Sequence, residues 1–306
     1  MMATVLAALL PIAAILALGK VSASLNLLSR EGWIGLERIT YFVLFPALIV
    51  SKLAVADFSG IDWRMPTALI GAQLLLSVAT ISAAALLRTA RDRIGVYVQS
   101  AARWNTFIAL ALAQDLFGAQ GLALVAVSAA VMIPTANILS VSALMHFSNE
   151  AVKPVQMLKK LAVNPLVLAC VIGIGLNISS LPLPGQAFEI LDLLAQATIA
   201  LGLLTTGAAI DLKGSGSSMT AATIWSVVRL AGLPLIAGTI AISLGLSGEV
   251  LYVILIATAV PTAVNGTILA RQLGADATLA ANLIAFQTIG SILSISMVLW
   301  IAGIGA

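Results

Sequence analysis

The chain has 306 residues, of which 61% are hydrophobic and only 9% are charged, with a formal net charge of +3. Soluble globular domains carry about 25% charged residues, so this composition excludes a soluble fold and predicts an all-α polytopic membrane protein. One cysteine, Cys170, and one histidine, His146, exclude a disulfide within the chain and any two-histidine metal centre. There is no G-x-x-x-x-G-K-[ST] loop, so neither ATP hydrolysis nor a bound cofactor is expected.

Apolar segments of about 20 residues recur along the whole chain, and each is long enough to cross a bilayer as a helix. The first segment has no basic region before it, which indicates a spanning helix and not a cleaved signal peptide. Turn and cap sequences separate many of the segments. In chain order, the ten predicted transmembrane helices cover residues 3–27, 33–55, 65–87, 94–117, 120–147, 159–178, 187–210, 219–245, 250–270 and 277–304.

The fifteen Lys and Arg residues are distributed unequally among the predicted loops. Eleven follow the odd-numbered helices, whereas the opposite loops hold only Lys52 and Arg64. By the positive-inside rule, the eleven face the cytoplasm and both termini lie outside, in a multi-pass protein of the plasma (inner) membrane. This bias explains the positive net charge, so no nucleic-acid partner is expected. The protein is expected to be embedded in the lipid bilayer. The eleven are Lys20, Arg30, Arg38, Arg88, Arg91, Arg93, Lys153, Lys159, Lys160, Lys213 and Arg271.

A polar connector at 148–158 divides the chain into two halves of five helices, 1–147 and 159–306. An odd number of helices per half gives the second half the opposite orientation, which is the inverted repeat common in secondary transporters. The fourth helix of each half carries a polar interruption, within 102–121 and within 259–276. A proline inside a helix removes one backbone donor, and the freed groups need a partner in protein or in a water-filled cavity.

Three segments resemble the auxin efflux carrier family, the bacterial relatives of the plant auxin carriers. They are "GWIGLERITYFVLFPALIVSKLA" (32–54), "RWNTFIALALAQDLFGAQG" (103–121) and "PTAVNGTILARQLGADATLAANLIAFQTIGSILSISMVL" (261–299). Their order and spacing are shared with the family over nearly the full length. The chain departs from the plant carriers in lacking a long central cytoplasmic loop, and in reading Trp-Asn where their fourth helix reads Pro-Asn.

The resemblance implies a fold like that of bile-acid symporters and antiporters, with two inverted five-helix repeats. The first, second, sixth and seventh helices would form a scaffold, often dimeric, so a homodimer is expected. The third to fifth and eighth to tenth helices would form the transport core, in which the broken fourth and ninth helices cross. Family members move small organic anions, including auxin, malate and malonate. Carried over to this sequence, the crossover falls at Trp104 and Asn105 and at Pro261 to Asn265.

Polar side chains at the crossover are the predicted substrate ligands. Asn105 and Thr106 belong to the fourth helix, and Thr262, Asn265 and Thr267 to the ninth, where Gly266 permits close backbone approach. Helix N-termini there would offer donors and a positive dipole end to an anion. The alternative is a proline kink packed against a neighbour, with Asn and Thr forming hydrogen bonds between helices.

Two arginines fall near the middle of predicted helices, Arg103 in the fourth and Arg229 in the eighth. A charge at the bilayer centre costs roughly 2.5–3.5 kcal/mol on insertion scales, so each is predicted to bind a carboxylate substrate. Alternatively, each pairs with helix carbonyls or an acid, or extends to the membrane surface.

Acidic and amide residues complete the prediction. No Asp or Glu falls at the centre of a span, since Glu37, Asp115 and Asp192 lie nearer the ends; this disfavours cation exchange as the main activity. The run "IPTAN" (133–137) is expected to break the fifth helix, and Pro46 to bend the second. The predicted supporting residues around the site are Gln73, Asn137 and Gln287.

The sequence therefore predicts a secondary transporter of small organic anions that works by alternating access. A sodium-coupled symporter of the same fold, with carbonyls around 261–265 holding the ion, is left open, as is coupling to protons. A non-transporting receptor is the rival, although the chain has no room for a soluble signalling domain. An intramembrane enzyme would need a nucleophile–base pair or paired carboxylates within the membrane, and neither is predicted.

Overall fold

The computed structural model describes residues 2–55, 63–147, 164–179, 184–210 and 216–303, and these ranges contain helices and no strand. Seven helical segments in them are long and apolar enough to cross a membrane, and two shorter apolar helices accompany these. The chain is thus a polytopic membrane protein, as its composition predicts. The predicted connector 148–158 lies outside the described residues.

Thirteen helical elements lie within the described residues. In chain order they are α1 (Met2–Ser24), α2 (Arg30–Ile39), the π-helical turn η1 (Thr40–Leu44), α3 (Phe45–Ala54), α4 (Arg64–Leu86), α5 (Arg91–Ala102), α6 (Thr106–Phe147), α8 (Pro165–Ser179), α9 (Gly185–Ala208), α10 (Gly216–Ser243), α11 (Gly248–Ala259), α12 (Gly266–Gln272) and α13 (Ala277–Ile301).

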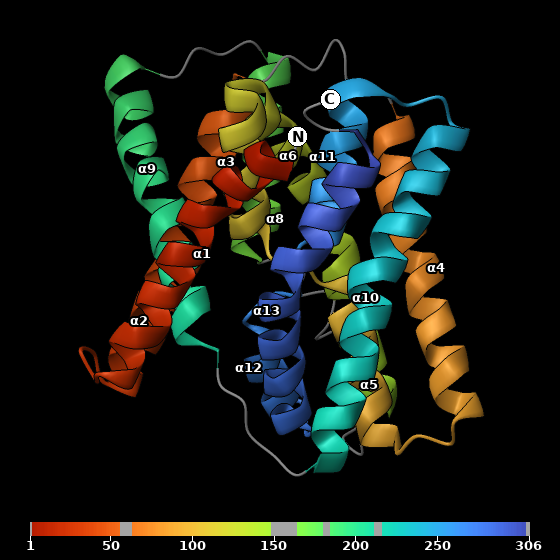
Figure 1. Ribbon diagram of the computed structural model, residues 1–306. Coiled ribbons are helices and arrows are strands. Elements are labelled where there is room, and N and C mark those ends of the chain that lie inside the picture. The colour runs from red at the N-terminus through yellow and green to blue at the C-terminus, as the bar shows by residue number, and fades with distance from the viewer. Residues whose placement is uncertain (1, 56–62, 148–163, 180–183, 211–215, 304–306) are drawn as a thin grey trace.

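Two groups of helices lie side by side in the bundle (Figure 1). In one group, α9 packs against α1, α2 and α3, and α8 packs against α3. In the other, α10 packs against α4, α11 and α13, and α4 packs against α5. The long helix α6 contacts both groups. The start of α1 and the end of α13 lie at the same end of the bundle.

Polar contacts at the two ends of the bundle follow the charge segregation in the sequence. At one end, Lys20 Nζ donates to the Ile210 carbonyl at 2.6 Å, and Arg93 pairs with Asp276 at 3.3 Å. At the other end, Lys52 pairs with Asp192 at 3.1 Å, which joins α3 to α9. Residues assigned to one face of the membrane therefore gather at one end of the bundle.

The second predicted helix is not simply bent at Pro46, because a π-helical turn divides it. Pro46 stands in the first turn of α3, and η1 immediately precedes it. Proline cannot donate to the carbonyl one turn earlier, and a wider turn accommodates the missing bond. Thr198 of α9 donates its hydroxyl proton to the Leu44 carbonyl at 2.9 Å, which satisfies one acceptor of this turn. The widened turn places a short stretch of α2 and η1 opposite α9.

The predicted break at 133–137 is wrong. Helix α6 continues through Pro134 to Phe147, and Thr135 Oγ1 donates to the Val131 carbonyl at 2.8 Å inside it. The interruption of α6 lies instead at Gly118, whose φ of 59° and ψ of −140° are not helical. This positive φ favours glycine, because a Cβ would clash with the backbone there. Gly118 therefore divides α6 into two apolar segments.

Candidate functional site

The polar interruptions of the fourth and ninth predicted helices meet in the structure. Helix α5 ends at Ala102, and Arg103 continues in an extended conformation until α6 begins at Thr106. Helix α11 ends at Ala259, Val260 is extended, and α12 begins at Gly266. The backbone N–H of Asn105 donates to the Pro261 carbonyl at 2.7 Å. This bond satisfies backbone groups that neither interrupted helix can satisfy internally.

Asn105 fixes the first interruption through its side chain. Its Oδ1 accepts from the amides of Phe107 and Ile108, at 3.1 and 3.2 Å, so Asn105 caps the N-terminus of α6. Its Nδ2 donates to Thr206 Oγ1 of α9 at 3.2 Å. Asn105 therefore joins the interruption to the other group of helices.

The C-terminal ends of α5 and α11 receive long polar side chains from the neighbouring helices. Arg229 of α10 donates to the Thr258 carbonyl at 2.6 Å and to the Arg103 carbonyl at 3.2 Å. Gln73 of α4 donates to the Ala102 carbonyl at 2.8 Å. A guanidinium at two helix C-termini is stabilised by the negative ends of both dipoles. The wholly buried Arg229 thus pairs with helix carbonyls, which is the predicted alternative to binding a carboxylate substrate.

The second interruption is held by two glutamines. Gln287 of α13 accepts from the Thr262 amide at 2.9 Å and donates to Ser100 of α5 at 2.5 Å. Gln99 of α5 donates to the Gly266 carbonyl at 3.0 Å. A Cβ added at Gly266 would lie 3.0 Å from Gln99 Nε2, so glycine permits this close approach.

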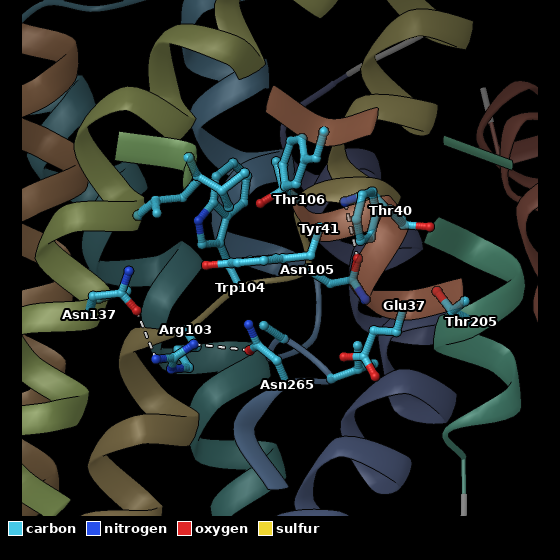
Figure 2. Close-up of a pocket in the computed structure, with 17 residues that line it drawn as sticks. Glu37, Thr40, Tyr41, Arg103, Trp104, Asn105, Thr106, Asn137, Thr205 and Asn265 are labelled. Atoms are coloured by element: carbon cyan, nitrogen blue, oxygen red, sulfur yellow. Dashed lines mark hydrogen bonds between the residues drawn. The ribbon is translucent and has the colours of Figure 1, made fainter. Parts of the chain in front are cut away.

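A cavity of about 70 Å³ lies against the meeting point of the interruptions (Figure 2). Of the predicted site residues, six line it and seven do not. Those lining it are Arg103, Trp104, Asn105, Thr106, Asn137 and Asn265. Those elsewhere are Gln73, Arg229, Pro261, Thr262, Gly266, Thr267 and Gln287.

Among the residues that the structure describes, Arg103 is the one cationic residue that lines this cavity. Its Nε donates to Ser140 Oγ at 3.3 Å, and its two terminal nitrogens donate to Asn265 Oδ1 at 3.0 Å and Asn137 Oδ1 at 2.8 Å (Figure 2). All three acceptors are neutral. Among the described residues, no carboxylate lies within ion-pairing distance of this guanidinium, which is 8% exposed. A buried charge without a counter-ion favours binding of an anion.

Four polar lining residues escaped the sequence prediction of the site. Glu37, Thr40 and Tyr41 come from α2 and η1, and Thr205 comes from α9 (Figure 2). Asn164 donates to the Tyr41 hydroxyl at 3.1 Å. The sequence indicates that the first three of these four residues share one helix face, because residues three and four apart on a helix lie on the same side. The segment "ERITY" (37–41) places three polar groups at that spacing.

An aromatic layer forms another wall of the cavity. The rings of Phe45 and Phe107 lie 4.9 Å apart between centroids. Gly202 of α9 packs directly on Phe107, since an added Cβ would lie 2.4 Å from that ring. One turn further along α3, α6 and α9 lies a second cavity of about 550 Å³, whose lining includes Leu48 and Ala111. The aromatic layer therefore separates the two cavities.

Comparison with known sequences places the chain in a family. The family described as "Membrane transport protein" matches residues 4–301, almost the entire chain. The chain belongs to this transporter family, the auxin efflux carriers. An "Uncharacterized transporter" from Methanothermobacter thermautotrophicus (strain Delta H) is 26% identical over 291 residues, which cover 92% of each chain. The resemblance drawn from the three sequence segments is thereby confirmed, and this is a family of membrane transporters.

Proposed function

We propose that this transporter carries small organic anions across the membrane by secondary active transport, with the substrate bound at Arg103. The observation that carries the proposal is the buried guanidinium of Arg103, which faces a cavity at the meeting point of two interrupted helices and contacts only neutral acceptors. Charged residues inside a membrane domain commonly mark substrate pathways.

A carboxylate fits the chemistry of this cavity. It can replace the Asn265 or Asn137 oxygen on Arg103 and form a stronger, charge-assisted pair of hydrogen bonds. The Thr106 side chain lines the same space, while Phe45 and Ile133 provide apolar wall for the body of the acid. Small carboxylates with a compact apolar or hydroxylated body, such as auxin-like or malate-like acids, are the proposed class.

We infer ten membrane crossings arranged as two inverted repeats. Seven long apolar segments are present, of which Arg91–Phe147 is 57 residues long and is interrupted at Gly118, so it can cross twice. The two shorter apolar helices, α8 and α11, supply the remaining crossings. In support of a repeat, α4 and α10 each send a polar side chain, Gln73 and Arg229, to the C-terminus of an interrupted helix.

Alternating access would use the two groups of helices. The group α1, α2, α3, α8 and α9 corresponds to the proposed scaffold, which would also form the homodimer, and both interruptions belong to the other group. Sliding of one group past the other must break the bond from Asn105 to Thr206 and separate Phe107 from Gly202. The layer of Phe45 and Phe107 is the barrier that we expect to open toward the second cavity.

The alternative of a sodium symporter requires carbonyl oxygens at the second interruption that are free to coordinate the ion, and few are free. The carbonyls of Pro261, Ala263 and Asn265 accept from the amides of Asn105, Gly266 and Leu269. The Val264 carbonyl accepts from Thr267 at 3.4 Å. Each of these carbonyls already accepts a protein hydrogen bond and would offer sodium only its second lone pair, so we favour transport without sodium.

The proposal is tested by thermal stability of the purified protein with acetate, indole-3-acetate, malonate and malate, each with and without sodium. We expect at least one acid to raise the unfolding temperature. The shift should vanish in Arg103→Gln and persist in the matched control Arg30→Gln, which removes an exposed arginine. A flat response to every acid, or the same shift in Arg103→Gln, would contradict the anion site.

A further inference from the structure

We propose that Glu37 is the proton-coupling carboxylate of this transporter: it takes up one proton when an organic anion binds at Arg103. The inference rests on the proposed function, because it presumes the anion site. It adds the coupling ion and the residue that carries it. Protons and substrate would then cross the membrane together.

The position of Glu37 brings a carboxylate to the anion site from the scaffold side. Glu37 lies in α2, seven residues after Arg30, or about 10 Å into the candidate span by helical rise. It is half-buried and lines the same cavity as Arg103. Figure 2 shows both side chains at this cavity, with Asn265 drawn between them. Glu37 has no ion-pair partner among the described residues.

Apart from Arg103, no charged side chain among the described residues faces Glu37 within the cavity. The described residues that line this cavity include three titratable side chains, Glu37, Arg103 and Tyr41. Helix α9, which packs against α2, carries its two acids, Glu189 and Asp192, near its other end, and residues 193–208 include no titratable side chain. On α2 itself, Glu31 and Arg38 are exposed. The electrostatics of the cavity therefore depend on Arg103, Glu37 and the substrate.

Charge balance couples the proton to the anion. If Glu37 is ionised in the empty cavity, its negative charge balances the positive charge of Arg103, which lines the same cavity. A carboxylate bound at Arg103 adds a second negative charge to a confined space, and two carboxylates that share such a site are not both ionised. Arg103 stabilises the ionised form of the substrate, so the proton goes to Glu37. The cavity loaded with a monocarboxylate and one proton then has the same net charge as the empty cavity.

This balance has a consequence for the conformational change. Moving an uncompensated charge through the hydrocarbon region is unfavourable, so states that keep the cavity neutral interconvert more readily. Binding of the anion alone would leave the cavity charged, and protonation of Glu37 removes that charge. The fully loaded carrier and the empty carrier are the two forms expected to change conformation.

Proton uptake on binding is the direct test. Indole-3-acetate and acetate, each a monocarboxylate at pH 7, are titrated calorimetrically into the full-length protein at pH 7, in PIPES and in Tris, whose ionisation enthalpies differ widely. The difference in binding enthalpy between the buffers gives the number of protons taken up. We expect about one proton per bound anion for the wild type and for Glu31→Gln, the matched control on the same helix. We expect about zero for Glu37→Gln, with binding retained.

Each outcome decides a different claim. Anion binding without proton uptake, or uptake that persists in Glu37→Gln, overturns the role of Glu37 and leaves the anion site intact. Failure of both acids to bind wild-type protein overturns the proposed function, and this inference with it. If Glu37→Gln does not fold, Glu37→Asp keeps the carboxyl group and must still take up a proton; loss of uptake in a folded Glu37→Asp that binds the anion also contradicts the inference.

Discussion

At the scale of single residues, the two membrane-embedded arginines have different surroundings. Arg103 contacts three neutral side chains, two of which line the cavity with it. Arg229 is 1% exposed and donates to backbone carbonyls at the ends of two helices. Side-chain acceptors can rotate away to admit a substrate, whereas helix carbonyls are fixed by the backbone. We therefore assign Arg103 to binding and Arg229 to stability.

The substitutions Arg103→Gln and Arg229→Gln should separate these roles. Loss of a hydrogen bond to a charged group is worth about 1.5–3 kcal/mol, so Arg103→Gln should weaken anion binding roughly 10- to 100-fold with little change in unfolding temperature. Arg229→Gln should lower the unfolding temperature, because it leaves buried carbonyls without a donor. Calorimetric titration and thermal unfolding of both variants check this, and equal effects of the two variants on binding would contradict it.

Asn105 should matter for both stability and transport. Asn105→Ala removes the cap of α6 and the bond to Thr206, so we expect a loss of about 1 kcal/mol of stability and loss of uptake into proteoliposomes. Thr206→Val is the matched control, since it removes the bond between the helix groups, together with the bond from Thr206 to the Gly202 carbonyl within α9, and leaves the cap of α6 intact. Normal uptake by a folded Asn105→Ala protein would rule out a role of Asn105 in transport.

At the scale of helices, Gly202 of α9 packs closely against Phe107 of α6. A Cβ added at residue 202 would lie 2.4 Å from the Phe107 ring, so either the ring or α9 would have to move. The contact joins a helix of the proposed scaffold to an interrupted helix of the proposed core. It therefore reports on relative movement of these elements.

The double substitution Gly202→Ala with Phe107→Ala tests that contact. Gly202→Ala alone should destabilise the protein by about 1–3 kcal/mol through overpacking and should reduce uptake. In a double-mutant cycle, removal of the Phe107 ring should restore much of the stability lost to Gly202→Ala. Additive effects on unfolding would show that residue 202 and the ring do not interact.

The sequence predicted apolar spanning segments and the positions of the two polar interruptions, but not the π-helical turn or the contacts between helices. Apolar length was enough to identify spanning segments, because the thickness of the bilayer imposes it. The π-helical turn and the uninterrupted path of α6 through Pro134 depend on which neighbouring groups satisfy freed carbonyls, and a linear pattern does not contain that information. For Glu37 and Tyr41, the spacing in "ERITY" shows that they share a helix face, but only the packing of α2 and η1 against α9 shows that this face meets the cavity.

At the scale of the whole molecule, the segregation of basic residues to one end of the bundle predicts its orientation. The end that carries Lys20 and Arg93 should face the cytoplasm, with both termini outside. On a background without Cys170, a membrane-impermeant maleimide applied to intact cells should label Ser247→Cys and not Leu25→Cys. Both positions are exposed, so accessibility is matched. Labelling of Leu25→Cys alone would reverse the orientation.

The central claim is that Arg103 binds the organic anion that this protein transports. The most direct measurement is uptake of radiolabelled malate and indole-3-acetate into proteoliposomes that contain wild-type protein, Arg103→Gln or the exposed control Arg30→Gln. We predict saturable uptake of at least one acid by the wild type and by Arg30→Gln, and uptake near the protein-free background by Arg103→Gln. Uptake by Arg103→Gln equal to that of the wild type would contradict the account.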